Sequence, residues 1–331
     1  MSEKRARLIL DLDTGVDDAL ALAYALGSPE VELAGVVCTY GNVTMRTAVR
    51  NTVALLELLG HPEVPVFAGA DRALAAVEPF APPAGVARIH GKNGFGDQPI
   101  SGWCRCAPGD GMAFLRSEAQ RALGEKDARL LYVPTGPLTD LALGLGSIAG
   151  LADALGRVTF MGGALVVPGN VTSCAEANVA NDPAAADTVL RGGLRTRMVG
   201  LDVTHQAVLT REDTAAWREL GTPAGRFFAD MTDHYIAVYE ENNPHLGGCA
   251  LHDPLAVAVA IDPSLVGCLA ANLRVDLEGV TRGRTVCDPE RLRDARKTCE
   301  VALTVDALRF LGEFRTRVTR VLAQARRTPA E

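Results

Sequence analysis

The chain has 331 residues, of which 48% are hydrophobic and 22% charged, and its formal net charge is -7. This composition is typical of a globular protein with a sizeable core, and the negative charge argues against partners such as nucleic acid or anionic lipid. The sequence has no run of about 18 uncharged apolar residues and no signal-peptide pattern, so we expect no membrane span and a cytoplasmic protein.

Predicted strands and helices alternate along the first two thirds of the chain. Near-continuous apolar strands separated by helices indicate a mostly parallel, open α/β sheet with helices on both faces. The pattern predicts strands at 7–13, 33–40, 64–69, 129–136, 157–163 and 195–204, and helices at 16–26, 44–59, 111–123 and 137–145.

Beyond residue 210 the pattern changes, which predicts a helical insertion on the Rossmann-like core. Long helices are expected across 211–242 and at 252–261, later strands at 272–279 and 299–306, and a closing helix at 306–326. No linker or repeat divides the sequence, so we expect a single domain over residues 1–331.

An acidic cluster lies where the first predicted strand ends and the first helix begins. The stretch DLDTGVDD holds the carboxylates of Asp11, Asp13, Asp17 and Asp18 within eight positions. Like charges at such close range destabilise one another unless a counter-charge is present. Oxygen donors alone suit a hard divalent cation such as calcium or magnesium.

The acidic cluster could also arise without a bound cation of this kind. Asp17 and Asp18 could be ordinary residues of a helix N-terminus. An EF-hand loop is excluded, because Val16 and Leu22 occupy the positions of its glycine and glutamate. The stretch also resembles the DxDxT motif of haloacid-dehalogenase-like phosphatases, with Asp11 as nucleophile, but glycine replaces the threonine.

Motifs far downstream decide between a metal site, a helix N-terminus and a phosphatase nucleophile. Together with DLDTGVDD, their order resembles the inosine–uridine-preferring nucleoside hydrolases, a likeness that covers about residues 7–326. The resemblance implies calcium-dependent hydrolysis of the N-glycosidic bond of a ribonucleoside, giving free base and ribose. The motifs are YGN (40–42), VPTGPLT (133–139), MGG (161–163), GNVTSCAEAN (169–178), GLDVTHQ (200–206) and HDP (252–254).

The resemblance also implies roles for individual residues. Asp17 would be the general base for the attacking water, and His252 would assist the leaving base. Asp11 is expected to support the metal ligands without binding the ion itself; the alternative is a capping or solvated carboxylate. The implied calcium ligands are Asp13, Asp18, Asp253 and the backbone carbonyl of Thr135.

A second set of residues is implied to bind the substrate. Amide and carboxylate groups suit the ribose hydroxyls, which both donate and accept hydrogen bonds. His90 lies in a glycine-rich segment typical of an active-site loop, although a solvated histidine is an alternative, and His205 is interpreted as structural. The implied substrate-binding residues are Asn42, Met161, Asn170, Glu176, Asn178, His90 and Tyr239.

The sequence departs from the family at two positions. Thr14 replaces a usual proline, and Ala177 replaces an aromatic residue beside the sugar. Either the substrate is bulkier near its 5′ end, or another side chain fills the space, for which the apolar residues 165–167 are the candidates. A calcium-dependent nucleoside- or ribose-binding protein with little turnover is therefore the alternative function. We expect a small-molecule nucleoside partner and a homodimer or homotetramer. Base preference depends on segments 79–110 and 225–250 and is not determined.

Overall fold

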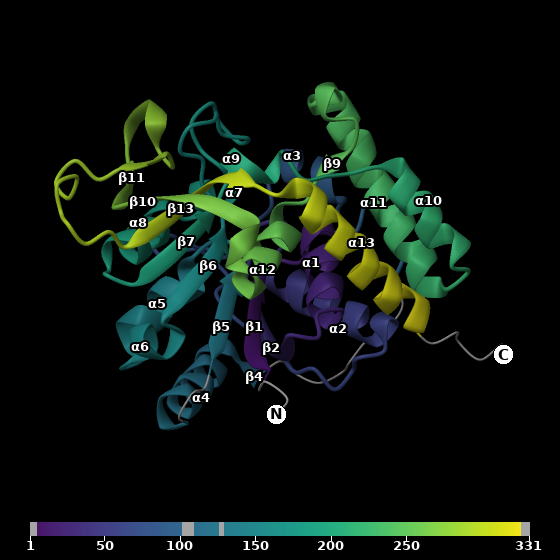
Figure 1. Ribbon diagram of the computed structural model, residues 1–331, viewed down its shortest axis with the longest axis horizontal. Helices are drawn as coiled ribbons and strands as arrows, with labels where there is room; N and C mark the ends of the chain where they lie inside the picture. The colour runs from purple at the N-terminus through teal and green to yellow at the C-terminus, as the bar shows by residue number, and fades with distance from the viewer. Residues whose placement is uncertain (1–4, 101–108, 126–128, 326–331) are drawn as a thin grey trace.

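The computed structural model describes residues 5–100, 109–125 and 129–325 (Figure 1). Two sheets form its centre. The first has five parallel strands in the order β4-β3-β2-β1-β5, and the second has the order β10-β13-β7-β6, in which only β10 is antiparallel to its neighbour. Strands β5 and β6 lie side by side where the two sheets meet. The expected α/β fold with a mostly parallel sheet is confirmed.

The strands are short, as is usual in a sheet whose helices lie on both faces. Their bounds are β1 Ala6–Leu12, β2 Val31–Cys38, β3 Val66–Ala68, β4 Gly109–Asp110, β5 Leu130–Pro134, β6 Arg157–Met161, β7 Arg195–Val199, β8 Val208–Leu209, β9 Cys249–Ala250, β10 Val266–Ala271, β11 Leu273–Val275, β12 Thr285–Cys287 and β13 Cys299–Val305.

The helices vary from single turns to a helix of 20 residues. Their bounds are α1 Val16–Leu26, α2 Met45–Leu59, α3 Ala84–His90, α4 Gly111–Gly124, α5 Thr139–Ser147, α6 Leu151–Leu155, α7 Ala177–Asn181, α8 Pro183–Arg191, α9 Leu201–Thr204, α10 Arg211–Glu219, α11 Pro223–Asn242, α12 His252–Ile261 and α13 Ala307–Gln324. None of them, within the described residues, combines the length and apolarity needed to span a bilayer.

Strand β1 is buried on both sides because its side chains alternate between two hydrophobic cores. Leu8 and Leu10 pack with α1, α2, α11, α12 and α13, whereas Ile9 packs with α4, α5, α6 and α8. Alternation with a period of two residues sends neighbouring side chains to opposite faces of a strand. The long helices predicted after residue 210 thus form part of the cover of one face.

Three sequence predictions needed correction. The strand predicted at 157–163 ends at Met161, because Gly162 and Gly163 take φ angles of +158° and +80° and leave the extended conformation. The strand predicted at 195–204 ends at Val199, and α9 follows. The strand predicted at 272–279 is only β11, which pairs with β12 outside the main sheets.

Several short elements were not predicted. Asp182 caps the start of helix α8, where its side chain accepts a hydrogen bond from Ala185 N, and Pro183 is the first residue of the helix. That Asp-Pro pair is a recognisable helix start that the sequence analysis did not use. Edge strand β10 was also missed.

Candidate active site

A cavity of about 520 Å³ opens beyond the carboxyl ends of the central strands. Ligands bind at this edge in open α/β sheets because the loops that follow the strands converge there. Predicted site residues from all parts of the chain line it: Asp17, Asn42, His90, Thr135, Met161, Asn170, Glu176, Asn178, Tyr239, His252 and Asp253.

Three carboxylates meet at this cavity: Asp17 and Asp253 line it, and Asp18 lies against them. Asp17, Asp18 and Asp253 are buried, and each offers an oxygen that lies within 4.8 Å of the others. Asp17 and Asp18 lie in the first turn of α1 and Asp253 in the first turn of α12, so two helix N-termini, which carry partial positive charge, face the cluster. Residues far apart in the chain are therefore brought to one point.

Asp13 joins the cluster through Asn42. The Asn42 backbone N donates to Asp13 Oδ2 at 2.7 Å, and its side-chain amide donates to Asp13 Oδ1 at 3.0 Å and Asp18 Oδ2 at 3.1 Å. Thr135 Oγ1 donates to Asp18 Oδ1 at 2.8 Å. The amide of Asn42, expected at the ribose, thus also fixes two carboxylates.

The carboxylates have free oxygens that suit a cation. Asp17 Oδ1 and Asp253 Oδ2 are buried and have no hydrogen-bond partner among the described residues. Burial raises the pKa of Asp253 well above its usual range, and the neighbouring Asp17 and Asp18 carboxylates raise it further. Unpartnered buried oxygens facing like charges are the donor set that a hard divalent cation satisfies.

The carbonyl of Thr135 lies at the end of β5. The Asn178 side-chain amide donates to it at 2.5 Å and to the Met161 carbonyl at 3.2 Å. Asn178 thereby ties together the ends of β5 and β6, next to the acidic cluster.

Gly41 allows the backbone to approach Asp13. Its φ is +152°, and an added Cβ would lie 2.0 Å from Asp13 Oδ2. We expect Gly41→Ala to displace Asp13 and to abolish the rise in melting temperature that a divalent cation gives the wild type, measured by thermal unfolding with and without calcium.

Gly60→Ala is the matched control. Gly60 also has a positive φ, +81°, but nothing lies within 4 Å of its added Cβ. This variant carries the backbone strain alone and should keep the response to cations. An equal response in both variants would contradict a role for Asp13 in holding the ion.

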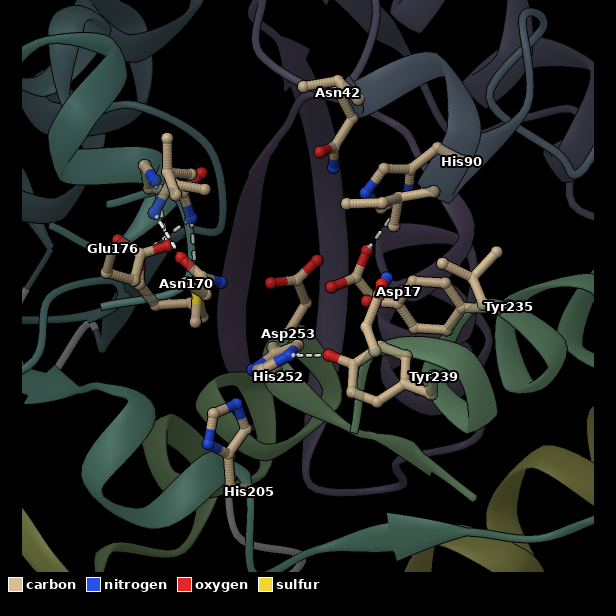
Figure 2. A pocket seen from close by; sticks show the side chains of 18 of the residues that line it. Asp17, Asn42, His90, Asn170, Glu176, His205, Tyr235, Tyr239, His252 and Asp253 are labelled. Carbon is tan, nitrogen blue, oxygen red and sulfur yellow. Dashed lines mark hydrogen bonds and ion pairs between the residues drawn. The ribbon is translucent and has the colours of Figure 1, made fainter. Parts of the chain in front are cut away.

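One side of the cavity, next to the acidic cluster, is lined by aromatic rings. Tyr239 Oη and His252 Nε2 are 2.5 Å apart, and His252 Nδ1 is 2.7 Å from Thr204 Oγ1 (Figure 2). Burial lowers the pKa of His252 to about 3, so its ring is neutral near pH 7. Both ring nitrogens of His252 already contact hydroxyl groups, so Nε2 could protonate another group only by giving up its contact with Tyr239.

His90 lies on the same side, at the end of helix α3. Its Nδ1 accepts a hydrogen bond from Val16 N at 3.3 Å and is 3.9 Å from Asp17 Oδ1, and its ring packs against Tyr235 with centroids 5.5 Å apart. The expectation of a flexible glycine-rich loop is wrong for His90, and so is the solvated alternative, because the side chain is buried in a helix.

Asn170 and Glu176 face the aromatic side from across the acidic cluster, as Figure 2 shows. The Glu176 carboxylate accepts hydrogen bonds from Gly163 N at 2.8 Å and Asn178 N at 2.9 Å. Asn170 Oδ1 accepts one from Ala177 N at 3.0 Å, which leaves its NH₂ group for a ligand. The cavity therefore has one side of amides and a carboxylate and another of aromatic rings.

His205 and Tyr235 are among the lining residues that the sequence analysis did not assign to the site. Tyr235 lies one helical turn before Tyr239 on α11, a spacing that was visible in the sequence. His205, interpreted as structural, packs its ring against that of His252 with centroids 5.5 Å apart.

Asp11 does not line the cavity. Its carboxylate accepts a hydrogen bond from Tyr132 Oη, and the nearby Asp140 carboxylate belongs to α5 on the far face of the sheet. The backbone carbonyl of Asp11 supports the site instead, by accepting a hydrogen bond from Thr135 N at 2.9 Å. A phosphatase mechanism with Asp11 as nucleophile is therefore excluded.

The space beside Ala177 also differs from the expectation. None of residues 165–167 lines the cavity, and Val166 is 68% exposed. Val171 lines the cavity together with Ala177. The other departure, Thr14, is buried with its Oγ1 2.7 Å from Thr52 Oγ1.

Comparison with known proteins identifies this arrangement. Residues 8–312 match the family model described as inosine-uridine preferring nucleoside hydrolase. The chain belongs to the nucleoside hydrolase family. It is 33% identical over 307 residues to the inosine-uridine preferring nucleoside hydrolase of Crithidia fasciculata, an alignment that covers 92% of this chain and 95% of the relative.

Two further relatives support membership of the nucleoside hydrolase family. The purine-preferring ribonucleoside hydrolase from Gardnerella vaginalis has a solved structure that matches with a TM-score of 0.91 and 51% identity, over 96% of this chain and 99% of that one. The probable uridine nucleosidase 2 of Arabidopsis thaliana is 33% identical over 318 residues, which cover 92% of this chain and 94% of the relative. The nucleoside hydrolase is thus an enzyme that cleaves ribonucleosides to base and ribose.

Proposed function

We propose that this nucleoside hydrolase depends on calcium and hydrolyses a neutral ribonucleoside or nucleoside-like metabolite. The observation that carries the proposal is the cluster of Asp17, Asp18 and Asp253 at one cavity, which has amide groups on one side and aromatic rings on the other. Among the described residues that line the cavity there is no lysine or arginine. A 5′-phosphate would have no cationic partner from them, which favours a nucleoside over a nucleotide.

Asp13, Asp18, Asp253 and the Thr135 carbonyl are the groups that would hold the ion. All are oxygen donors, as calcium prefers, and the described part of the chain offers no other partner to Asp253 Oδ2. When bound, the ion would supply an electrophilic centre that neutralises the carboxylates and orients the ribose diol and the attacking water.

Asp17 is proposed as the general base. Its Oδ1, which accepts no hydrogen bond from the described residues, is 3.9 Å from His90 Nδ1, and Asp17 lines the cavity. The carboxylate can therefore accept a proton from a water placed beside the sugar. Asp18, the next residue, points its oxygens toward Asn42, Thr135 and Gly15 N instead. Successive positions of a helix differ by about 100° in direction, which separates the two roles.

Tyr239 and His252 are proposed to assist the departing base as a pair. The neutral His252 ring cannot act as an imidazolium, and its Nε2 is already bonded to the Tyr239 hydroxyl. Tyr239 lines the cavity, so its hydroxyl can donate a hydrogen bond to a ring nitrogen of the base, while the neutral His252 ring donates from Nε2 to the Tyr239 oxygen and accepts at Nδ1 from the Thr204 hydroxyl. This modifies the sequence-based role, in which His252 acts alone.

The ribose is proposed to lie against Asn42, Asn170, Glu176, Asn178 and Met161. Glu176 and Asn178 are fixed by backbone contacts at the ends of β5 and β6, so they need little reordering when a sugar binds. His90 and Tyr235 lie beyond Asp17 toward the base side.

Release of free base from a panel of purine and pyrimidine ribonucleosides tests the proposal. The protein is treated with a calcium chelator, dialysed, and assayed before and after addition of calcium or magnesium. We expect turnover to be lost on chelation and to return with calcium. Full activity in the chelator would contradict the calcium dependence.

The base-release assay together with a measurement of ribose binding tests the alternative function of a binding protein. Ribose binding without base release from any nucleoside would favour that alternative, which was considered because Ala177 replaces a larger side chain beside the sugar. Cytoplasmic location and homo-oligomeric assembly stay predictions.

A further inference from the structure

The loop between β6 and α7, residues 164–176, carries Asn170 and Glu176 but forms no helix or strand. Such a segment would ordinarily be mobile, since it lacks a ladder of backbone hydrogen bonds. Several of its backbone polar groups are instead bonded to three side chains from distant parts of the chain, Asp202, Arg284 and Thr285, while those of residues 169–172 bond within the loop.

Arg284 holds the carbonyl groups of this loop. Its Nη2 donates to Leu165 O at 2.6 Å, and its Nη1 donates to Val167 O at 2.7 Å and Cys174 O at 3.3 Å. A guanidinium group has a planar, rigid set of donors, and hydrogen bonds from a charged donor are stronger than neutral ones. One side chain thereby joins the beginning of the loop, at 165–167, to its end at Cys174.

Two other side chains fix the start of the loop. Thr285 Oγ1 accepts a hydrogen bond from Ala164 N at 3.1 Å and donates one to Ala164 O at 2.8 Å. The Asp202 carboxylate accepts hydrogen bonds from Leu165 N at 2.9 Å and Val166 N at 2.7 Å. Arg284 and Thr285 lie where β12 begins, in the small β11–β12 sheet beside α8 (Figure 1).

The loop residues that Arg284 contacts are close in the chain to Asn170 and Glu176, which both line the cavity. Ala175 O, one residue after the carbonyl that Arg284 holds, accepts a hydrogen bond from Asn170 N at 3.2 Å. Asn170 Oδ1 in turn accepts one from Ala177 N. Movement of the 174–175 backbone would therefore shift both Asn170 and the start of α7 after Glu176.

We propose that Arg284 and Thr285 are positioning residues of the sugar side of the cavity. They act through the 164–176 loop, which they fix, and through it they place Asn170 and Glu176. The proposal rests on the proposed assignment of Asn170 and Glu176 to the ribose. It predicts a defect that is independent of the base, because every ribonucleoside presents the same sugar to this side.

Steady-state kinetics of Arg284→Met with one purine and one pyrimidine ribonucleoside provide the test. We expect kcat/KM to fall about tenfold to hundredfold, mainly through KM and by the same factor for both substrates, since small displacements of binding groups have effects of this size. The dissociation constant for free ribose, measured by calorimetry on the calcium-loaded enzyme, should rise in parallel.

Two comparisons separate this role from general stability. Arg195→Met is the matched control, because Arg195 is exposed and its Nε also donates to a backbone carbonyl, Gly156 O, at 3.2 Å. This substitution should leave KM unchanged. Thr285→Ser keeps the hydroxyl and should behave as wild type, whereas Thr285→Val should share the KM defect. If Arg284→Met does not fold, the comparison of Thr285→Ser with Thr285→Val still tests the positioning role.

A folded Arg284→Met enzyme with wild-type KM and ribose affinity would overturn the proposal, as would a defect confined to one base. Failure of the proposed function is a different result, namely a wild-type enzyme that releases no base from any nucleoside. Ribose affinity of the variants would still test the positioning role in that case.

Discussion

Asp17→Asn should release base about 10²–10⁴ times more slowly than the wild type, while its affinity for ribose changes little. Asparagine has nearly the shape of aspartate but cannot accept the proton from the attacking water. The groups proposed to hold the sugar, Asn170 and Glu176, lie across the cavity and bond to other partners than Asp17. Single-turnover base release and ribose calorimetry, both with calcium present, measure the two quantities.

Asp153→Asn is the control for this substitution. It removes one negative charge from the exposed surface of α6, outside the cavity, and should leave both quantities unchanged. If Asp17→Asn turned over at the wild-type rate, another group would have to be the base. If it lost ribose binding equally, Asp17 would be needed to hold the sugar or the ion.

Asp253→Asn should change the stability of the ion-free and ion-loaded protein in opposite directions. Without an ion, Asp253 is buried beside the Asp17 and Asp18 carboxylates, which raises its pKa. Replacing it by a neutral amide removes the free-energy cost of burying this carboxyl group and should raise the melting temperature in chelator at neutral pH. With calcium, the variant lacks a ligand and should lose the stabilisation of about 2.7 kcal/mol expected at about one hundred times the dissociation constant.

Asp140→Asn provides a buried comparison for Asp253→Asn. Asp140 is also buried, but it accepts hydrogen bonds from Ala70 N on the far face of the sheet and does not line the cavity. Its variant should keep the full calcium response even if it is less stable. Thermal unfolding of both variants with chelator and with calcium distinguishes them; an unchanged calcium response in Asp253→Asn would rule out Asp253 as a ligand.

The starts of helices show which elements local sequence patterns can predict. The helix predicted at 16–26 coincides with α1, because an apolar stretch follows an acidic first turn. His90 shows the limit: its glycine-rich neighbours suggested a loop, yet α3 packs against α11, where His90 contacts Tyr235 and is buried. Tertiary packing overrode the local preference.

Asp11 and Asp13 show that local patterns also cannot predict which carboxylates share the acidic cluster. Asp11 and Asp13 are two positions apart, so strand pleating predicts one direction for both, but β1 ends at Leu12 and the chain turns before Asp13. The Asp11 carboxylate consequently faces Tyr132, while Asp13 is held by Asn42. The end of the strand, which periodicity locates only within a few residues, decided which carboxylate joined the cluster.

Periodicity and motif order belong to the linear chain, and they were enough to predict the alternation of strands and helices, the negative charge after the first strand, and the family. They could not predict which side chains share the cavity, that the Tyr239 hydroxyl contacts His252 Nε2, or that Arg284 holds a loop far from it in the chain. Hydrogen bonds and charge repulsion act over a few ångströms, and distances across the fold do not follow separation along the chain.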